Sequence, residues 1–234
     1  MGKVCKKSSR ITCFQLLSSL SLLLASGCAS GPPMSGFLSD YSKFEKVQDD
    51  APVWESTDRA DGRIASDYVK LWRDASGLRE LSQYDRIIVE QTELRLSENS
   101  QVPPAKAKEL AQYLQDTLIA ALQERYPLAE NAGSGVLRFR AAITDIYPSR
   151  VFKDPNPTVE LTNSTAGGGT FEGEAIDSVT GERVFGIIAE VSGSRWDLLS
   201  QTDRWKQTKS CIAEMARFVR HLMDRAQSGA LEPS

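Results

Sequence analysis

Two carboxylates that share one face of an expected strand are the first residues in this chain that could support catalysis. Glu172 and Glu174 lie two positions apart in an alternating segment, so their side chains point to the same side of a strand. Paired carboxylates can act as acid and base in glycoside hydrolysis. A solvent-exposed strand face produces the same pattern, and Arg138 and Arg140 on a neighbouring strand could pair with these glutamates. We therefore predict an exposed polar face rather than a catalytic pair.

The other residue types that commonly carry catalysis are scarce. His221 is the single histidine, whereas a zinc site draws on several histidine or cysteine ligands. A catalytic triad would need the same His221, and the Gly-x-Ser-x-Gly turn that presents a nucleophilic serine is absent from the sequence. Residues 167–170 (Gly-Gly-Gly-Thr) lack the following lysine of a phosphate-binding loop. The sequence predicts no catalytic residue, no metal site and no cofactor.

A cysteine near the N-terminus indicates a different chemistry. Four basic residues within positions 3–10 precede an apolar run over residues 11–25, which is shorter than the ~20 residues of a spanning helix. Residues 24–28 then read Leu-Ala-Ser-Gly-Cys, which resembles the lipobox of bacterial lipoproteins. In such proteins the cysteine sulfur receives a diacylglyceryl group, and the cysteine becomes the new, acylated N-terminus after cleavage.

This resemblance predicts lipidation of Cys28 by fatty acids such as palmitate. Two or more acyl chains hold a protein stably on a membrane, at ~0.8 kcal/mol per buried CH₂ group. Ala25 departs from the larger aliphatic residue that is usual in a lipobox. Ala29 and Ser30 follow the cysteine without an aspartate, which resembles the signal for outer-membrane sorting, with the domain in the periplasm. The alternative is an ordinary signal peptide followed by an incidental cysteine.

Charge and cysteine content limit the possible partners of the mature chain. Removal of residues 1–27 takes away four basic and no acidic residues, which leaves 24 basic against 31 acidic residues and a net charge of −7. Nucleic-acid binding needs clustered basic residues, so no nucleic-acid partner is expected. The same charge disfavours an electrostatic hold on anionic lipid headgroups. Only Cys211 remains besides Cys28, which excludes an internal disulfide and favours a buried thiol.

Composition divides the chain into four parts. Residues 1–27 form the signal peptide, 28–66 a tether and docking leader, 67–228 a globular domain, and 229–234 a flexible tail. Glycine and proline near the anchor oppose regular structure. The leader then carries four large apolar or aromatic residues that disordered linkers lack: Phe37, Leu38, Tyr41 and Phe44. We expect this segment to pack on the domain, and Trp54 could do likewise.

The expected elements follow the order strand, helix, three strands, helix. Strands are predicted near 84–90, 136–143, 170–176 and 183–191, with a short extended segment at 68–72. Helices are predicted from 103 to no farther than 126 and from 203 to 226. The last two strands form a hairpin with Gly181 in the turn, and residues 163–169 are expected to be a mobile loop. The pattern predicts an α/β (α+β) two-layer sandwich, with a mixed sheet of about four to five strands and both helices on one face.

Four segments together are similar to a known family of bacterial lipoproteins, the domain-of-unknown-function 3313 family. These segments are Gly36–Ser42, Tyr84–Val89, Leu137–Asp145 and Ile176–Glu182. Phe44 stands where the family would have leucine. The resemblance implies a lipoprotein and brings no activity, substrate or catalytic residue.

Three functions are compatible with these observations. The first is a non-enzymatic envelope module, held at the membrane by the acyl chains on Cys28, that binds an envelope protein or glycan. The second is an enzyme that acts on cell-wall glycan through Glu172 and Glu174 or through other acidic residues. The third is a carrier of a lipid-like molecule, which would need an apolar cavity between sheet and helices. The lack of catalytic clusters favours the first.

Overall fold

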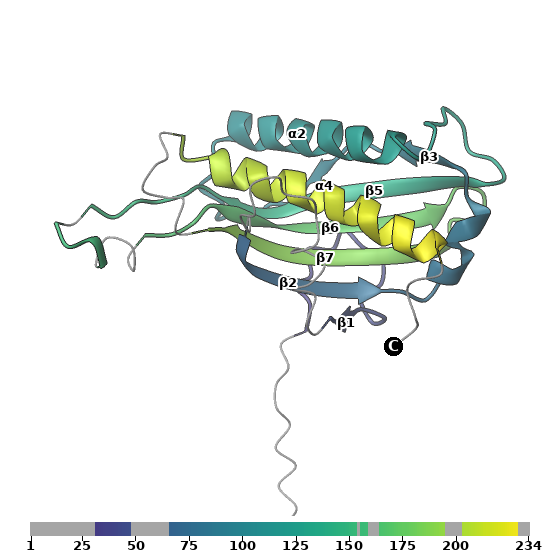
Figure 1. Ribbon diagram of the computed structural model, residues 1–234, viewed down its shortest axis with the longest axis horizontal. Helices are drawn as coiled ribbons and strands as arrows, with labels where there is room; N and C mark the ends of the chain where they lie inside the picture. Colours follow the sequence, from purple (N-terminus) through teal and green to yellow (C-terminus); the bar gives the residue numbers. More distant parts are fainter. Residues whose placement is uncertain (1–30, 48–65, 154, 159–163, 195–202, 229–234) are drawn as a thin grey trace, which may run out of the picture. The chain divides into compact units, whose positions relative to one another are not determined.

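The computed structural model describes residues 31–47, 66–153, 155–158, 164–194 and 203–228. These residues belong to one compact unit, residues 31–234. Its centre is one open sheet, and its helices lie along one face of that sheet (Figure 1).

The sheet has seven strands in the order β1-β2-β7-β6-β5-β3, and β4 also pairs with β5. The strands are β1 (Glu45–Lys46), β2 (Ser66–Asp74), β3 (Arg86–Val89), β4 (Glu93–Leu94), β5 (Val136–Tyr147), β6 (Gly168–Asp177) and β7 (Arg183–Gly193). Strands β3 and β4 run parallel to β5, and all other pairs are antiparallel. The sheet is therefore mixed, as predicted.

The type of connection between strands explains whether each pair is antiparallel or parallel. The β6–β7 hairpin turns at Gly181, whose φ of 76° lies in the left-handed region that glycine adopts without strain. Asp177 stabilises the same turn because its Oδ1 accepts the backbone N–H of Val179 (2.8 Å) and of Thr180 (2.7 Å). Strand β3 is instead followed by a helix that crosses the sheet, which permits its parallel pairing with β5.

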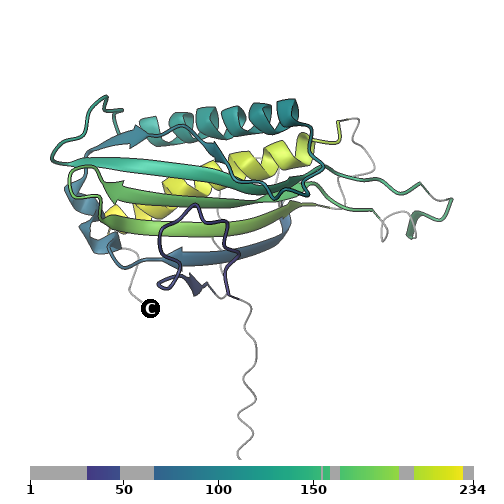
Figure 2. The same cartoon turned by 180° about the vertical axis from the view of Figure 1, so that it is seen from behind.

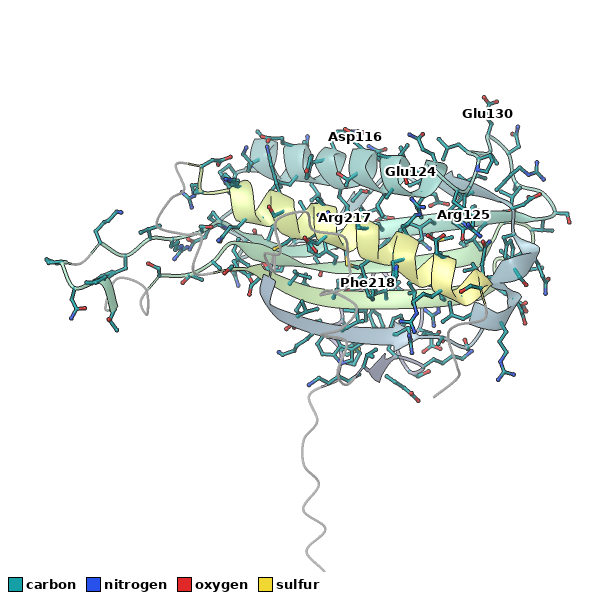
Figure 3. All side chains as sticks on the ribbon, viewed as in Figure 1. Asp116, Glu124, Arg125, Glu130, Arg217 and Phe218 are labelled. Carbon is teal, nitrogen blue, oxygen red and sulfur yellow. The ribbon has the colours of Figure 1, made fainter. Side chains whose placement is uncertain are left out.

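The helices are α2 (Pro104–Gln123), α4 (Lys206–Gln227) and the short 3-10 helix η1 (Leu78–Gln83). A leucine stripe of α2 faces the sheet, with Leu110, Leu114, Leu118 and Leu122 all buried. These residues pack in one core with apolar residues of α4 and with Phe139, Phe171 and Phe185 from three adjacent strands. Polar residues such as Asp116 and Arg217 lie on the outer surface of the helices (Figure 3). Within the described ranges, no helix has the length and hydropathy that crossing a bilayer requires.

The predicted architecture is confirmed, although the sheet is larger than expected. Strands β1 and β4 have two residues each, which is too short to produce an alternating pattern. The prediction of a loop over residues 163–169 was wrong for its last two residues, since Gly168 and Gly169 are buried residues of β6. Residue 163 and Trp54 lie outside the described residues, as do the signal peptide and the C-terminal tail.

The described part of the leader, residues 31–47, crosses the sheet face opposite the helices (Figure 2). It ends in β1, which pairs with the outer edge of β2 through Glu45–Arg73 and Lys46–Trp72. Phe37, Leu38 and Phe44 are buried there in a second apolar cluster. The prediction that the aromatic segment of the leader packs on the domain is thus confirmed.

Candidate functional site

Two rows of cross-strand neighbours define the sheet face beneath the leader. In the first row, Asp74 of β2, Gly186 of β7, Glu174 of β6 and Arg140 of β5 lie side by side. In the second row, two positions along each strand, the neighbours are Trp72, Ile188, Glu172 and Ala142. Because side chains alternate along a strand, both rows point away from the helices. The result is a face that places buried charges next to an apolar patch.

Glu174 lies between two arginines. Arg140 Nη1 is 3.0 Å from Glu174 Oε1, and Arg183 Nη1 is 3.5 Å from Glu174 Oε2. Arg183 Nε also donates to Asp74 Oδ2 at 2.9 Å. Glu174 is 3% exposed and Asp74 is 1% exposed, and charges buried so deeply require partners. The two arginines supply those partners.

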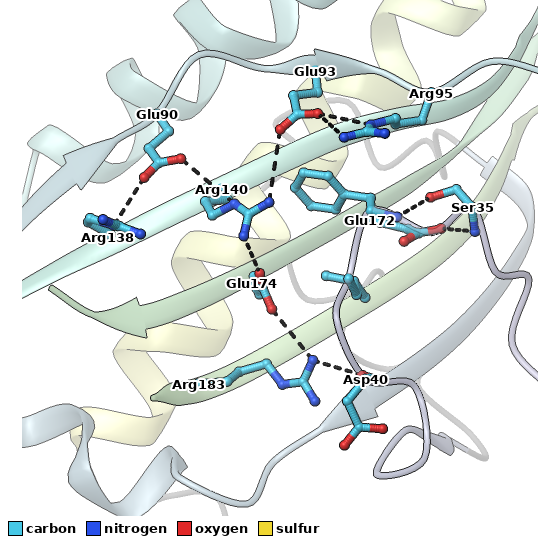
Figure 4. A network of polar contacts seen from close by, with 12 residues as sticks. Ser35, Asp40, Glu90, Glu93, Arg95, Arg138, Arg140, Glu172, Glu174 and Arg183 are labelled. Carbon is cyan, nitrogen blue, oxygen red and sulfur yellow. Dashed lines mark hydrogen bonds and ion pairs between the residues drawn. The ribbon is translucent and has the colours of Figure 1, made fainter. Parts of the chain in front are cut away.

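The charged network continues toward the β3 side of the sheet (Figure 4). Arg138 Nε is 3.0 Å from Glu90 Oε1, while Arg140 also approaches Glu90 Oε2 at 3.7 Å. Glu93 then joins Arg140 to Arg95, at 3.9 Å and 2.8 Å respectively. These outer pairs are partly exposed to solvent, so losing one of them should cost less folding stability than losing a partner of the buried pairs.

Glu172 differs from Glu174 because its hydrogen bonds come from the leader. Its Oε1 accepts the backbone N–H of Ser35 at 3.1 Å, and its Oε2 accepts the hydroxyl of Tyr41 at 2.6 Å. Glu172 is 1% exposed. Burial, and then the hydrogen bond to Glu172, raise the pKa of Tyr41. Leader and carboxylate therefore depend on each other: docking satisfies a buried acid, and the acid fixes Tyr41.

Aromatic rings of the leader cover the same arginines. The Cζ atom of Arg140 lies 4.8 Å from the centre of the Phe37 ring, and that of Arg183 lies 5.1 Å from the Phe44 ring, within the range of cation–π attraction. Arg183 Nη1 also donates to the backbone oxygen of Asp40 at 2.9 Å.

Gly186 makes room for one of these rings. A Cβ atom at this position would lie 2.4 Å from Phe44 Cζ, so a side chain there would displace the ring. The sheet face is therefore shaped to accept the leader.

The prediction that Glu172 and Glu174 occupy a solvent-exposed face was wrong, because the leader covers that face. The expected pairing with arginines is confirmed for Arg140 with Glu174, whereas Arg138 pairs with Glu90 instead. Asp74 and Arg183 were missed by sequence reasoning. The aromatic leader was the available signal, since a segment rich in large apolar residues must cover some part of the domain.

The remaining candidates take structural positions. Cys211 is buried in α4, as expected, and burial raises the pKa of its thiol to about 12. His221 is partly buried on the same helix. In the part of the chain that the structure describes, no three histidine, cysteine or acidic side chains are grouped as metal ligands would be. Cys28 lies outside the described residues.

Comparison with known proteins identifies the family of this chain and a relative that aligns with most of its length. Residues 33–219 match the family described as protein of unknown function DUF3313. The uncharacterized lipoprotein YdcL of Escherichia coli K12 is 29% identical over 226 residues, which cover 88% of this chain and 95% of YdcL.

The solved structures are more distant. PelC from Paraburkholderia phytofirmans, solved as a dodecamer, has a TM-score of 0.38 at 12% identity and covers 65% of this chain and 98% of its own. A Caulobacter crescentus protein described as a lipoprotein has a TM-score of 0.32 at 13% identity and covers 68% of this chain and all of its own. Likeness at this level carries no functional conclusion.

Proposed function

We propose, from the premise that the chain belongs to the DUF3313 family of proteins of unknown function, that it is an outer-membrane lipoprotein. Its domain faces the periplasm and binds another envelope component, a protein or a glycan, without catalysing a reaction. Acyl chains on Cys28 hold it at the membrane.

The main support for a lipid anchor is the sequence Leu24-Ala25-Ser26-Gly27-Cys28, which directly follows a basic and then an apolar segment. The similarity to a lipoprotein over most of the chain supports it. A single acyl chain binds only marginally, whereas several chains hold a domain stably. The absence of an aspartate after Cys28 supports outer-membrane sorting.

The environment of the two glutamates supports a binding role over an enzymatic one. General acid catalysis requires a carboxyl group within hydrogen-bond reach of the substrate. Glu174 is held between Arg140 and Arg183, and Glu172 is capped by Ser35 and Tyr41. With the leader docked, both carboxylates are covered and engaged.

A Cys28→Ser variant tests the anchor. We expect wild-type cells to incorporate a palmitate analogue into the protein and to retain it in the outer-membrane fraction, and the variant to lose both properties. Cys211→Ala is the matched control because Cys211 is a buried thiol in the domain. A processed Cys28→Ser protein that still fractionates with the outer membrane would contradict the proposal.

A further inference from the structure

The leader connects the proposed anchor to one particular edge of the domain. It begins at the β1–β2 side of the sheet, crosses the face until Phe37 contacts Arg140 of β5, and returns to the same side at β1 (Figure 2). Ser35 and Asp40 mark the crossing, since Ser35 bonds to Glu172 of β6 and Asp40 to Arg183 of β7 (Figure 4). The described leader thus forms a loop whose two ends lie at the β1–β2 edge.

The number of residues between Cys28 and this loop is small. Three peptide steps separate Cys28 from Gly31, where the described leader starts, and they span at most about 11 Å when fully extended. The opposite edge, at β3, lies five strand positions from β1, or about 24 Å at the usual strand spacing. While the leader is docked, the β1–β2 edge can therefore approach an acylated Cys28 more closely than the β3 edge can.

The docked leader is held on the sheet at several points, and these contacts keep the connection between Cys28 and the domain short. Glu172 accepts hydrogen bonds from Ser35 and Tyr41, and Phe44 fills the space left by Gly186. At the end of the loop, the backbone N–H of Val47 donates to the oxygen of Leu71 at 2.9 Å. These contacts keep residues 35–47 from lengthening the tether.

The surface at this edge suits contact with a bilayer. Met34 is 72% exposed in the segment nearest the anchor, where an apolar side chain can enter the headgroup region. Lys43 and Lys46 are exposed, and Arg73 lies opposite Glu45. Within residues 31–47 the charges of Lys43 and Lys46 balance those of Asp40 and Glu45, so this described part of the leader does not share the acidic excess of the mature chain.

We infer that the β1–β2 edge, with residues 31–47 of the leader, is a lipid-facing surface that rests on the phospholipid headgroups. This inference rests on the proposed acylation of Cys28. It leaves the β3 edge, with the adjoining end of α2 and Glu130 (Figure 3), directed away from the membrane.

Site-directed fluorescence on the acylated protein tests this orientation. Lys46→Cys and Glu130→Cys place one label at each edge, because both positions are exposed and Cys211 is buried. The proteins are reconstituted in vesicles of phosphatidylethanolamine and phosphatidylglycerol that carry a headgroup quencher. We expect several-fold stronger quenching at position 46 than at position 130. Equal or reversed quenching in protein that floats with the vesicles would overturn the inference.

A lengthened tether is the matched control. Insertion of about 20 Gly/Ser residues after Ser30 would add roughly 25 Å of average reach, and the difference between the two positions should then largely disappear. An unchanged difference would overturn the claim that the tether sets the orientation. Flotation is a separate readout: protein that does not float would contradict the anchor itself, and with it this inference.

Discussion

At the level of single residues, Arg183 is the charged side chain on which most of the buried network depends. It pairs with Asp74 and Glu174, donates to the leader backbone at Asp40, and lies against Phe44. Removing one partner of a buried ion pair leaves an uncompensated charge, which typically costs ~3–5 kcal/mol. We expect Arg183→Ala to lower the free energy of unfolding by an amount in this range, as measured by urea denaturation.

Arg95 provides the matched control for Arg183. Its pair with Glu93 has a similar distance, 2.8 Å, but both side chains are more than 40% exposed. Exposed pairs contribute at most ~1 kcal/mol, so Arg95→Ala should change the unfolding free energy little. Equal losses in the two variants would show that burial of Asp74 and Glu174 does not set the cost.

The buried side chain of Tyr84 should make the stability of the fold decrease at alkaline pH. Tyr84 donates its hydroxyl to Asp177 Oδ2 at 3.0 Å, and burial, then this hydrogen bond, raise the pKa of Tyr84 to about 12. An unfolded tyrosine ionises near pH ~10. As the pH rises from ~10 toward ~12, the unfolded state therefore loses the proton first, and stability falls.

Tyr84→Phe tests this dependence. The variant should lose less stability between about pH 9 and about pH 11 than the wild type does, because one ionising group has been removed. Urea midpoints at the two pH values measure the difference. Tyr126 and Tyr147 have pKa values raised in the same way, so a smaller pH dependence is expected rather than none. An identical dependence in both proteins would refute the role of Tyr84.

At the level of elements, the leader behaves as an additional layer of the fold. A double-mutant cycle tests its fit to Gly186. Gly186→Ala alone should weaken docking, because the new Cβ would meet Phe44 Cζ at 2.4 Å. In a Phe44→Ala background the same change should cost much less. Hydrogen exchange of residues 36–44, together with urea denaturation, measures the coupling between the two sites.

Gly133 offers a control for this cycle, since a Cβ atom there would have nothing within 4 Å. Gly133→Ala should leave exchange in the leader unchanged. Additive effects of Gly186→Ala and Phe44→Ala would contradict the proposed fit of the ring over the glycine.

The same element shows how far the sequence could predict the structure. The leucine stripe of α2 and the alternation of β5 and β7 reveal which residues face the helices, because one side of each element is uniformly apolar. The opposite sheet face was misjudged at Glu172 and Glu174. Their alternation with apolar residues is the same whether water or the leader covers them, and the covering segment lies more than 130 positions away in the sequence.

Long-range pairing also explains why Asp74 and Arg183 were not predicted as partners. They are 109 residues apart, and only the antiparallel pairing of β2 with β7 brings their strands together. The leader itself was predictable, because four large apolar or aromatic residues within a short segment need a surface to cover.

At the level of the whole molecule, the leader follows the proposed anchor in the sequence and covers Glu172 and Glu174, the two carboxylates considered as a catalytic pair. Purified protein incubated with peptidoglycan should therefore release no soluble glycan fragments. The same result is expected for the Gly186→Ala variant, in which docking of the leader should be weakened. A non-enzymatic module should remain inactive in both states, because uncovering the sheet face still leaves Glu174 paired with Arg140 and Arg183.

The two proteins together separate the alternatives. Cleavage by the wild type would contradict the binding role and indicate a catalytic group outside the covered face. Cleavage by Gly186→Ala alone would show instead that the leader suppresses an activity of the covered carboxylates. Glu172→Gln in the Gly186→Ala background then distinguishes the two glutamates, since Glu172 has hydrogen-bond partners in the leader, whereas Glu174 keeps its arginines. Loss of cleavage in that variant would identify Glu172 as the acid, and the leader as the segment that keeps it covered.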